Sequence, residues 1–133
     1  MTETTTYNGA FAIVPYRDPR AGIAWLEKTF GAVATALHPP EPDQPLKHGE
    51  VRIGTGLVMI NDADRDDSPF ALPGPVLLYV AVDDPDALHD RAVAAGAEIV
   101  MGLTDQDYGS RDFAARDPHG NVWSFGTYRP STG

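Results

Sequence analysis

The sequence contains no cysteine among its 133 residues. This absence excludes disulfides, thiolate nucleophiles and zinc sites built on cysteine, and it fits a reducing compartment. Basic side chains are also scarce, because 10 lysines and arginines stand against 19 aspartates and glutamates, for a net charge of −9. Since phosphate binding needs clustered lysine and arginine, we expect no nucleic-acid partner.

Long apolar runs are missing as well. No segment approaches the roughly 20 residues that a helix needs to cross a bilayer. The opening MTETTTYNGA is polar and has no basic or apolar region of the kind found in signal peptides. We therefore expect a cytoplasmic protein without a membrane partner. The length is that of one ordinary domain, so residues 1–133 are predicted to form a single domain.

The most informative feature that is present is an internal repeat. DPRAGIAWLEKTFGA begins at Asp18, and DPDALHDRAVAAGA begins at Asp84, about half the chain later. Each copy follows an apolar, strand-like run, AFAIVPY or PVLLYVAV. A repeat of this length indicates two copies of one supersecondary unit.

Local chemistry predicts the same elements in both copies. Asp18 and Asp84 suit the N-cap of a helix, and the proline after each suits the first helical position. Gly31 and Gly96 are typical of helix ends. Alternating or β-branched runs then predict three strands in each half, at Val33–Leu37, Val51–Ile53, Leu57–Ile60, Glu98–Met101, Arg111–Ala115 and Val122–Thr127.

The predicted fold class is therefore α+β, with two tandem βαβββ modules. Module 1 spans about residues 9–61, an acidic linker about 62–74, and module 2 about 75–128. The turn Asp117-Pro118-His119-Gly120 joins the last two strands, because Pro118 presets a type I turn and Gly120 tolerates the left-handed conformation after it.

Two βαβββ halves, with RDPHGNVW closing the second, resemble the vicinal oxygen chelate superfamily, which includes glyoxalase I, bleomycin-resistance proteins and extradiol dioxygenases. The stretches HGEVRIGTGLVMINDA and RDPHGNVWSFGTY are most similar to its PhnB-like subgroup. The resemblance implies that the strands form an open, cup-like mixed sheet around a ligand cleft, and that two chains form a homodimer. It leaves open whether the modules pair within one chain or swap between chains.

The resemblance also implies where a metal would be bound. In metal-dependent members four strand positions supply ligands, and on this sequence they fall at Phe11, Met59, Leu77 and Ser124, with an error of one residue at Phe11 and Leu77. Transition metals prefer imidazole, carboxylate or thiolate donors. We therefore predict no metal and no other cofactor.

Period-two alternation extends these positions into a cleft lining. Such a lining is mostly apolar with a few polar tips, as in small-molecule pockets, although the same apolar residues could equally fill a core. The predicted ligand-binding residues on the strands are Phe11, Ile13, Leu57, Met59, Asn61, Leu77, Tyr79, Val122 and Ser124.

Two further residues, Tyr108 and Arg111 in DQDYGSRDF, are candidates for the rim of the cleft, where they would bind an anion or an aromatic ring. The alternative for Arg111 is an ion pair with a neighbouring acid.

A functional alternative comes from His48 and Glu50, which lie two residues apart in KHGEV and so share one strand face. They are candidates for a displaced metal site or an acid/base pair. The alternative is an exposed pair on an edge strand, without a function.

These observations favour a metal-independent small-molecule binding protein that sequesters an antibiotic or aromatic metabolite. The alternative is a lyase, isomerase or oxygenase with a displaced metal site or metal-free acid/base chemistry. No catalytic residue can be assigned from the sequence.

Overall fold

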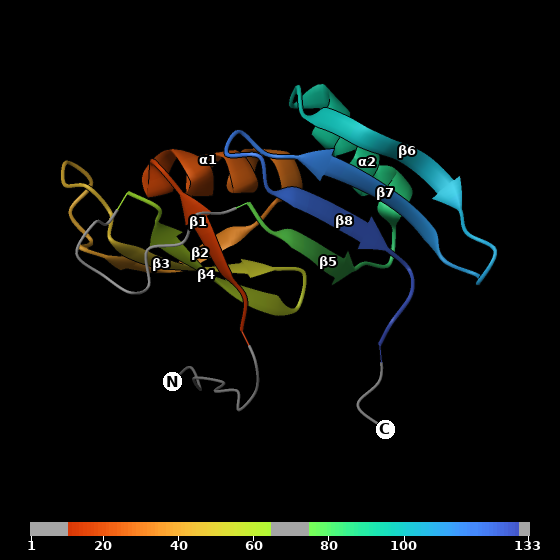
Figure 1. Ribbon diagram of the computed structural model, residues 1–133, viewed down its shortest axis with the longest axis horizontal. Helices are drawn as coiled ribbons and strands as arrows, with labels where there is room; N and C mark the ends of the chain where they lie inside the picture. Colours follow the sequence, from red (N-terminus) through yellow and green to blue (C-terminus); the bar gives the residue numbers. More distant parts are fainter. Residues whose placement is uncertain (1–10, 65–74, 131–133) are drawn as a thin grey trace.

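The computed structural model describes residues 11–64 and 75–130, which form two modules side by side (Figure 1). Each module consists of a strand, a helix and three further strands, which confirms the predicted α+β architecture. The predicted residues 9 and 10 and most of the linker, 65–74, lie outside the described residues. The elements are β1 (Ile13–Tyr16), α1 (Pro19–Phe30), β2 (Val33–His38), β3 (His48–Ile53), β4 (Gly56–Asp62), β5 (Leu77–Ala81), α2 (Pro85–Ala94), β6 (Glu98–Asp105), β7 (Arg111–Arg116) and β8 (Val122–Gly126).

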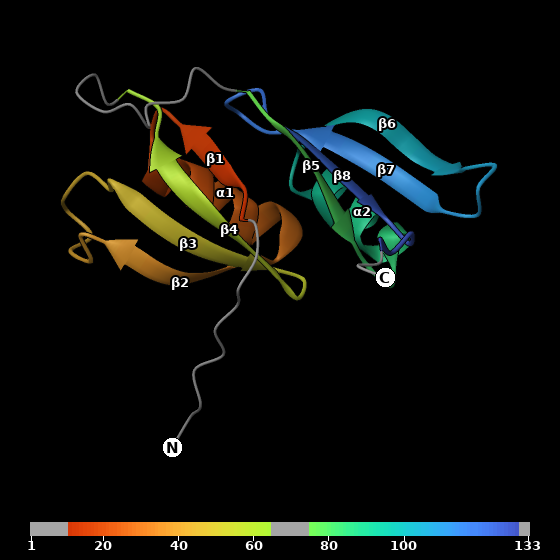
Figure 2. The same cartoon turned by 60° about the horizontal axis from the view of Figure 1, so that its bottom comes forward.

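The strands form two separate, open four-stranded sheets (Figure 2). Their orders are β1-β4-β3-β2 and β5-β8-β7-β6, so the second sheet repeats the topology of the first. β1 pairs with β4 and β5 with β8 in parallel, and the remaining neighbours are antiparallel. The first strand of each module therefore lies beside its last strand, which brings residues from the two ends of a module onto one surface.

Both helices begin as the sequence predicts. The carboxylate of Asp18 accepts a hydrogen bond from the Ala21 amide at 3.2 Å, and that of Asp84 accepts one from the Ala87 amide at 3.0 Å. α1 ends at Gly31, whose φ of 71° lies in the left-handed region that glycine tolerates. The caps therefore fix the start of each helix through local chemistry alone.

Among the described residues, neither helix is long and apolar enough to cross a membrane.

One apolar core lies between the sheets and the helices and is shared by both modules. The two helices contact each other, and Phe30 of α1 lies 4.6 Å from Phe125 of β8 between ring centroids. The ring of Phe113 in β7 packs against α2, with its centroid 5.4 Å from that of the His89 ring. Because side chains alternate along a strand, the remaining strand residues project to the opposite surface, which we call the helix-free face.

Several strands are longer than the sequence predicts, including β3, β4 and β6. β3 begins at His48 instead of Val51, and β6 continues to Asp105 instead of ending at Met101. β3 pairs along its length with β4, from His48 opposite Asn61 onward, so pairing extends the strand into residues that carry no β-branched signal.

A buried carboxylate in the turn before β8 connects the two modules. Asp117 is only 4% exposed, and its Oδ2 accepts hydrogen bonds from the Tyr16 hydroxyl at 2.6 Å, the Trp123 indole at 3.0 Å and the Asn121 amide at 3.1 Å. Its Oδ1 accepts the backbone amides of His119 and Asn121 at 3.0 and 2.9 Å. Five donors thus converge on one charge, which is the condition under which a buried carboxylate is tolerated.

Tyr16 brings module 1 into this network, because it is the last residue of β1. Burial, and then the Asp117 charge, raises the pKa of Tyr16 well above its ordinary value, so the hydroxyl remains a donor. The Asn121 side chain adds a second link by donating to the Pro15 carbonyl at 3.2 Å. The turn that the sequence marks as a simple connection therefore also holds the modules together.

Replacing Asp117 with asparagine should destabilise the fold sharply. Both carboxylate oxygens face donors only, so an amide NH2 meets a donor whichever way it is turned, and the expected loss is about 2–4 kcal/mol in the free energy of unfolding. Urea denaturation measures this loss. Asp43→Asn, in an exposed loop, is the matched control, and an Asp117→Asn loss no larger than that of the control would show that the network contributes little.

Candidate functional site

The helix-free face of the first sheet carries four of the predicted site residues. Ile13 lies directly opposite Met59, and Leu57 and Asn61 flank Met59 on β4. Asn61 is buried, whereas Ile13, Leu57 and Met59 are half-buried. Phe11 precedes β1 and is also half-buried. The alternation inferred from the sequence therefore places this group on one surface.

The helix-free face of the second sheet carries four more. Leu77 lies opposite Val122, and Tyr79 lies opposite Ser124. Leu77 is 74% exposed and Tyr79 is 39% exposed, while Trp123 is fully buried on the helix side. The strand register thus separates the small hydroxyl of Ser124 from the aromatic side chains that flank it in sequence.

The strand register sets which residues are neighbours of Met59 and Ser124. Ile13 lies beside Met59, and Tyr79 lies beside Ser124. Phe11 and Leu77, the positions that the resemblance implies for metal ligands, each lie two residues earlier on the same side of the chain.

The set of Ile13, Met59, Tyr79 and Ser124 does not fit a metal. An alkyl chain, a thioether, a phenol and an alcohol are poor donors for zinc, iron, nickel or manganese. Within residues 11–64 and 75–130, no group of three or more histidine, aspartate or glutamate side chains is placed to hold an ion.

His48 and Glu50 form a polar pair on the helix-free face of the first sheet. Nε2 of His48 lies 3.3 Å from Oε2 of Glu50, and Glu50 lies opposite Met59 on the neighbouring strand. The His38 ring stacks near that of His48, with centroids 5.9 Å apart. A histidine bonded to a carboxylate is a common acid/base arrangement, so this pair is the part of the face best suited to proton transfer.

Three tyrosine rings gather at one end of the helix-free face of the second sheet, and we call Tyr79, Tyr108 and Tyr128 the tyrosine cluster. The Tyr108 ring lies 6.2 Å from that of Tyr128, and the Tyr79 ring lies 6.5 Å from it. The Tyr79 hydroxyl donates to the Tyr128 carbonyl at 2.6 Å. Tyr108 and Tyr128 are 62% and 52% exposed, so the cluster presents aromatic surface to solvent.

Asp112 lies beneath this cluster on β7. The Tyr108 hydroxyl donates to its Oδ2 at 3.1 Å, and the Ser110 hydroxyl makes a short hydrogen bond to its Oδ1. Asp112 is 4% exposed and lies opposite Gly126, whose missing side chain leaves room for the carboxylate. The arrangement combines one negative charge with several hydroxyl groups.

Two tyrosine hydroxyls in the cluster are held in the protonated form. Desolvation, followed by the hydrogen bond to Asp112, raises the pKa of Tyr108 above its ordinary value. Desolvation is also the main reason that the pKa of Tyr79 is raised. Both phenols are therefore neutral hydrogen-bonding groups at physiological pH.

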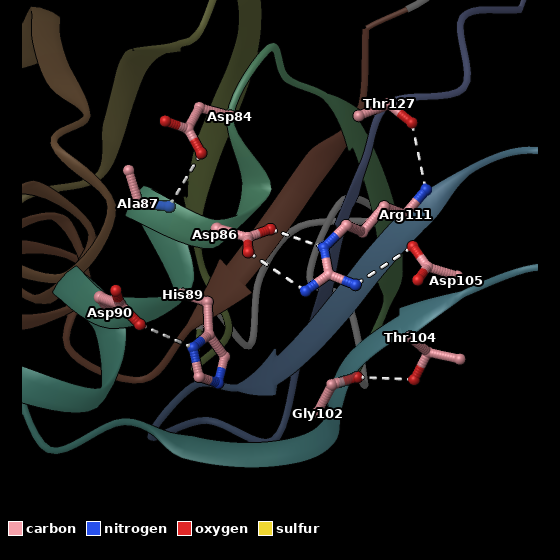
Figure 3. A network of polar contacts seen from close by, with 10 residues as sticks. All are labelled: Asp84, Asp86, Ala87, His89, Asp90, Gly102, Thr104, Asp105, Arg111 and Thr127. Carbon is pink, nitrogen blue, oxygen red and sulfur yellow. Dashed lines mark hydrogen bonds and ion pairs between the residues drawn. The ribbon is translucent and has the colours of Figure 1, made fainter.

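Arg111 does not join the other predicted site residues (Figure 3). Its guanidinium lies 2.7 Å from Asp86 of α2 and 3.1 Å from Asp105 of β6, on the helix side of the sheet. The hydrogen bond from Arg111 lowers the pKa of Asp86, as a stable pair requires. The ion pair considered as the alternative from the sequence is thus the arrangement observed, because alternation along β7 sends Arg111 and Asp112 to opposite faces.

Ser110, Asp112 and Tyr128 were not singled out from the sequence. A signal for Asp112 was present, because Phe113 and Ala115 alternate as buried apolar residues, which sends Asp112 to the opposite face. No comparable signal marks Ser110 or Tyr128, because both lie outside the strands. In the folded chain the backbone amide of Tyr128 donates a hydrogen bond to the Ser110 hydroxyl at 3.1 Å.

Comparison with known proteins identifies the family. The profile of the Glyoxalase/Bleomycin resistance protein/Dioxygenase superfamily matches residues 9–125. The chain belongs to this superfamily. It is 37% identical over 116 residues to the uncharacterized protein Rv0887c of Mycobacterium tuberculosis (strain ATCC 25618 / H37Rv), covering 82% of this chain and 68% of that protein.

Solved structures of similar shape include TioX from Micromonospora sp. ML1, with a TM-score of 0.74, 27% identity, and coverage of 91% of this chain and 100% of that one. A lactoylglutathione lyase from Agrobacterium tumefaciens has a TM-score of 0.64 at 19% identity, covering 91% and 95% of the two chains. The likeness to the lyase shows the glyoxalase fold alone.

Adding one methyl group at Gly126 should disrupt the cluster, because that group would overlap the Asp112 carboxylate and lie 2.9 Å from the Tyr79 hydroxyl. We expect Gly126→Ala to lower the free energy of unfolding by about 1–3 kcal/mol. Gly102→Ala is the control, since a methyl group there meets nothing within 4 Å. Thermal denaturation compares the two variants, and equal stability would mean that Asp112 does not occupy this space.

Proposed function

We propose that the protein binds a small organic molecule on its helix-free faces without a metal ion, and that it sequesters the molecule instead of converting it. The observation that carries this proposal is the chemistry of two neighbouring pairs of side chains on these faces. Ile13 lies beside Met59 in the first sheet, and Tyr79 lies beside Ser124 in the second. These side chains offer apolar contacts and two hydroxyl groups, which suit a ligand and not a transition metal. The preferred ligand class is an antibiotic or aromatic metabolite. We also propose that the protein belongs to the PhnB-like subgroup and that it is cytoplasmic.

The alternative function is catalysis by metal-free acid/base chemistry. The hydrogen-bonded His48 and Glu50 favour it, because they lie on the same face as Met59, and a lyase or isomerase needs such a pair. Conversion of the ligand over time separates this alternative from sequestration.

The binding proposal is tested by a thermal-shift screen of quinones, cationic glycopeptides and aromatic metabolites, with and without EDTA. A ligand present at 100 times its Kd should stabilise the protein by about 2.7 kcal/mol, and EDTA should leave this unchanged. The compound should be recovered intact by mass spectrometry after long incubation. Stabilisation that EDTA removes, or product formation that His48→Ala abolishes, would contradict the proposal.

We further propose that the chain forms a homodimer in which a second copy covers part of the helix-free face. Support comes from Leu77 in β5, whose large apolar side chain is 74% exposed on this side of the second sheet. Covering such a side chain with a second copy removes apolar surface from water, which favours association.

The dimer is tested by sedimentation velocity of the whole chain. Leu77→Glu should weaken association at least tenfold, because it places a charge on the covered surface. Val93→Glu, at an apolar residue of α2 that is 50% exposed, is the matched control. A wild-type monomer at high concentration, or an equal effect of both substitutions, would refute this arrangement.

A further inference from the structure

The tyrosine cluster surrounds a buried negative charge. Asp112 receives hydrogen bonds from the hydroxyls of Ser110 and Tyr108, and it is 4% exposed. In the part of the chain that the structure describes, Asp112 forms no ion pair with lysine, arginine or histidine. A carboxylate removed from water and bonded only to neutral hydroxyls retains an unbalanced charge, which a bound cation would stabilise.

The neighbouring arginines are already engaged by other acids. Arg111 lies on the opposite side of the sheet with Asp86 and Asp105, and Arg129 lies 2.5 Å from Asp83. Arg129 acts on the Tyr79 hydroxyl through its charge, but among the ion pairs of the described residues neither arginine is paired with Asp112. The unbalanced charge is therefore a property of the folded arrangement.

The rings around this charge add a second reason for cation binding. Tyr108 and Tyr128 are perpendicular, with an interplanar angle of 89°, so they form a corner with one ring face and one ring edge. The Tyr79 ring, from β5, is tilted by 55° from that of Tyr128, with the centroids 6.5 Å apart. The face of a tyrosine ring attracts cations within about 6 Å, and the attraction grows when water is excluded.

We propose that the tyrosine cluster and Asp112 form a subsite that selects an organic cation, such as a quaternary or aromatic ammonium group, at one end of the ligand. This inference rests on the proposed binding function and specifies its ligand class. The net charge of −9 would also favour the approach of a cation. In this arrangement Gly126 leaves space for the Asp112 carboxylate, and the Ser110 hydroxyl orients that carboxylate through a hydrogen bond.

The test compares two probes of nearly equal shape, N-methylquinolinium and quinoline, which is uncharged at pH 8. Calorimetric titration of the whole chain measures both affinities, and amide signals of Ser110, Gly126 and Tyr128 report the location by NMR. We expect the cation to bind roughly tenfold or more tightly than the neutral ring. Equal affinities, or no binding of either probe, would overturn the inference. Other compounds in the thermal-shift screen would still report on the proposed binding function.

Variants identify the source of the preference. Asp112→Asn should abolish the preference for the cation while quinoline binding is retained, and Asp90→Asn is the control with the same change in net charge on the exposed side of α2. Tyr108→Leu is a second variant at an exposed position and should weaken binding of the cation severalfold without unfolding the protein. An unchanged preference in both site variants would overturn the assignment to this cluster.

Discussion

The carboxylate of Asp117 accepts hydrogen bonds from residues of both modules, and the arrangement of the two sheets depends on this contact. Tyr16 reaches it from the end of β1, while Trp123 and Asn121 reach it from the start of β8 and the turn before it. Four of the five donors belong to residues 119–123, next to Asp117 in the chain, so the Tyr16 hydroxyl is the donor that fixes the end of β1 relative to the turn that precedes β8. The apolar core on the helix side of the sheets also joins the modules, because the Phe30 ring of α1 packs against the Phe125 ring of β8.

Fixing the modules through their helix side leaves the opposite side of each sheet available for function. The helix-free faces are chemically different from each other: the first carries a histidine–glutamate pair beside Met59, and the second carries tyrosines around Asp112. A repeat that duplicates the fold has therefore not duplicated the chemistry. This asymmetry is the physical basis for assigning the ligand's charged end to the second sheet.

The sequence alone predicted the features that depend on local chemistry. Asp18 and Asp84 cap their helices, and Gly120 follows the turn with a φ of 93°, because these residues act on their own neighbourhood. Alternation also separated Ser124 from Trp123 correctly. Long-range register is what the sequence could not supply: it did not show that Tyr79 lies opposite Ser124, and it left Arg111 open between the cleft rim and the ion pair that the structure shows. Ser110 and Tyr128 were missed because only the folded chain brings them together.

The most direct test of the central contact is hydrogen exchange at the two tryptophan indoles, followed by NMR on the native protein. The Trp123 indole is fully buried and donates to Asp117 at 3.0 Å, whereas Trp25 is half-buried on α1. The account predicts that the Trp123 indole exchanges only through global unfolding and is much slower than that of Trp25. Fast exchange of the Trp123 indole in the folded protein would contradict the claim that a closed network of buried donors surrounds Asp117, on which its contact with Tyr16 depends.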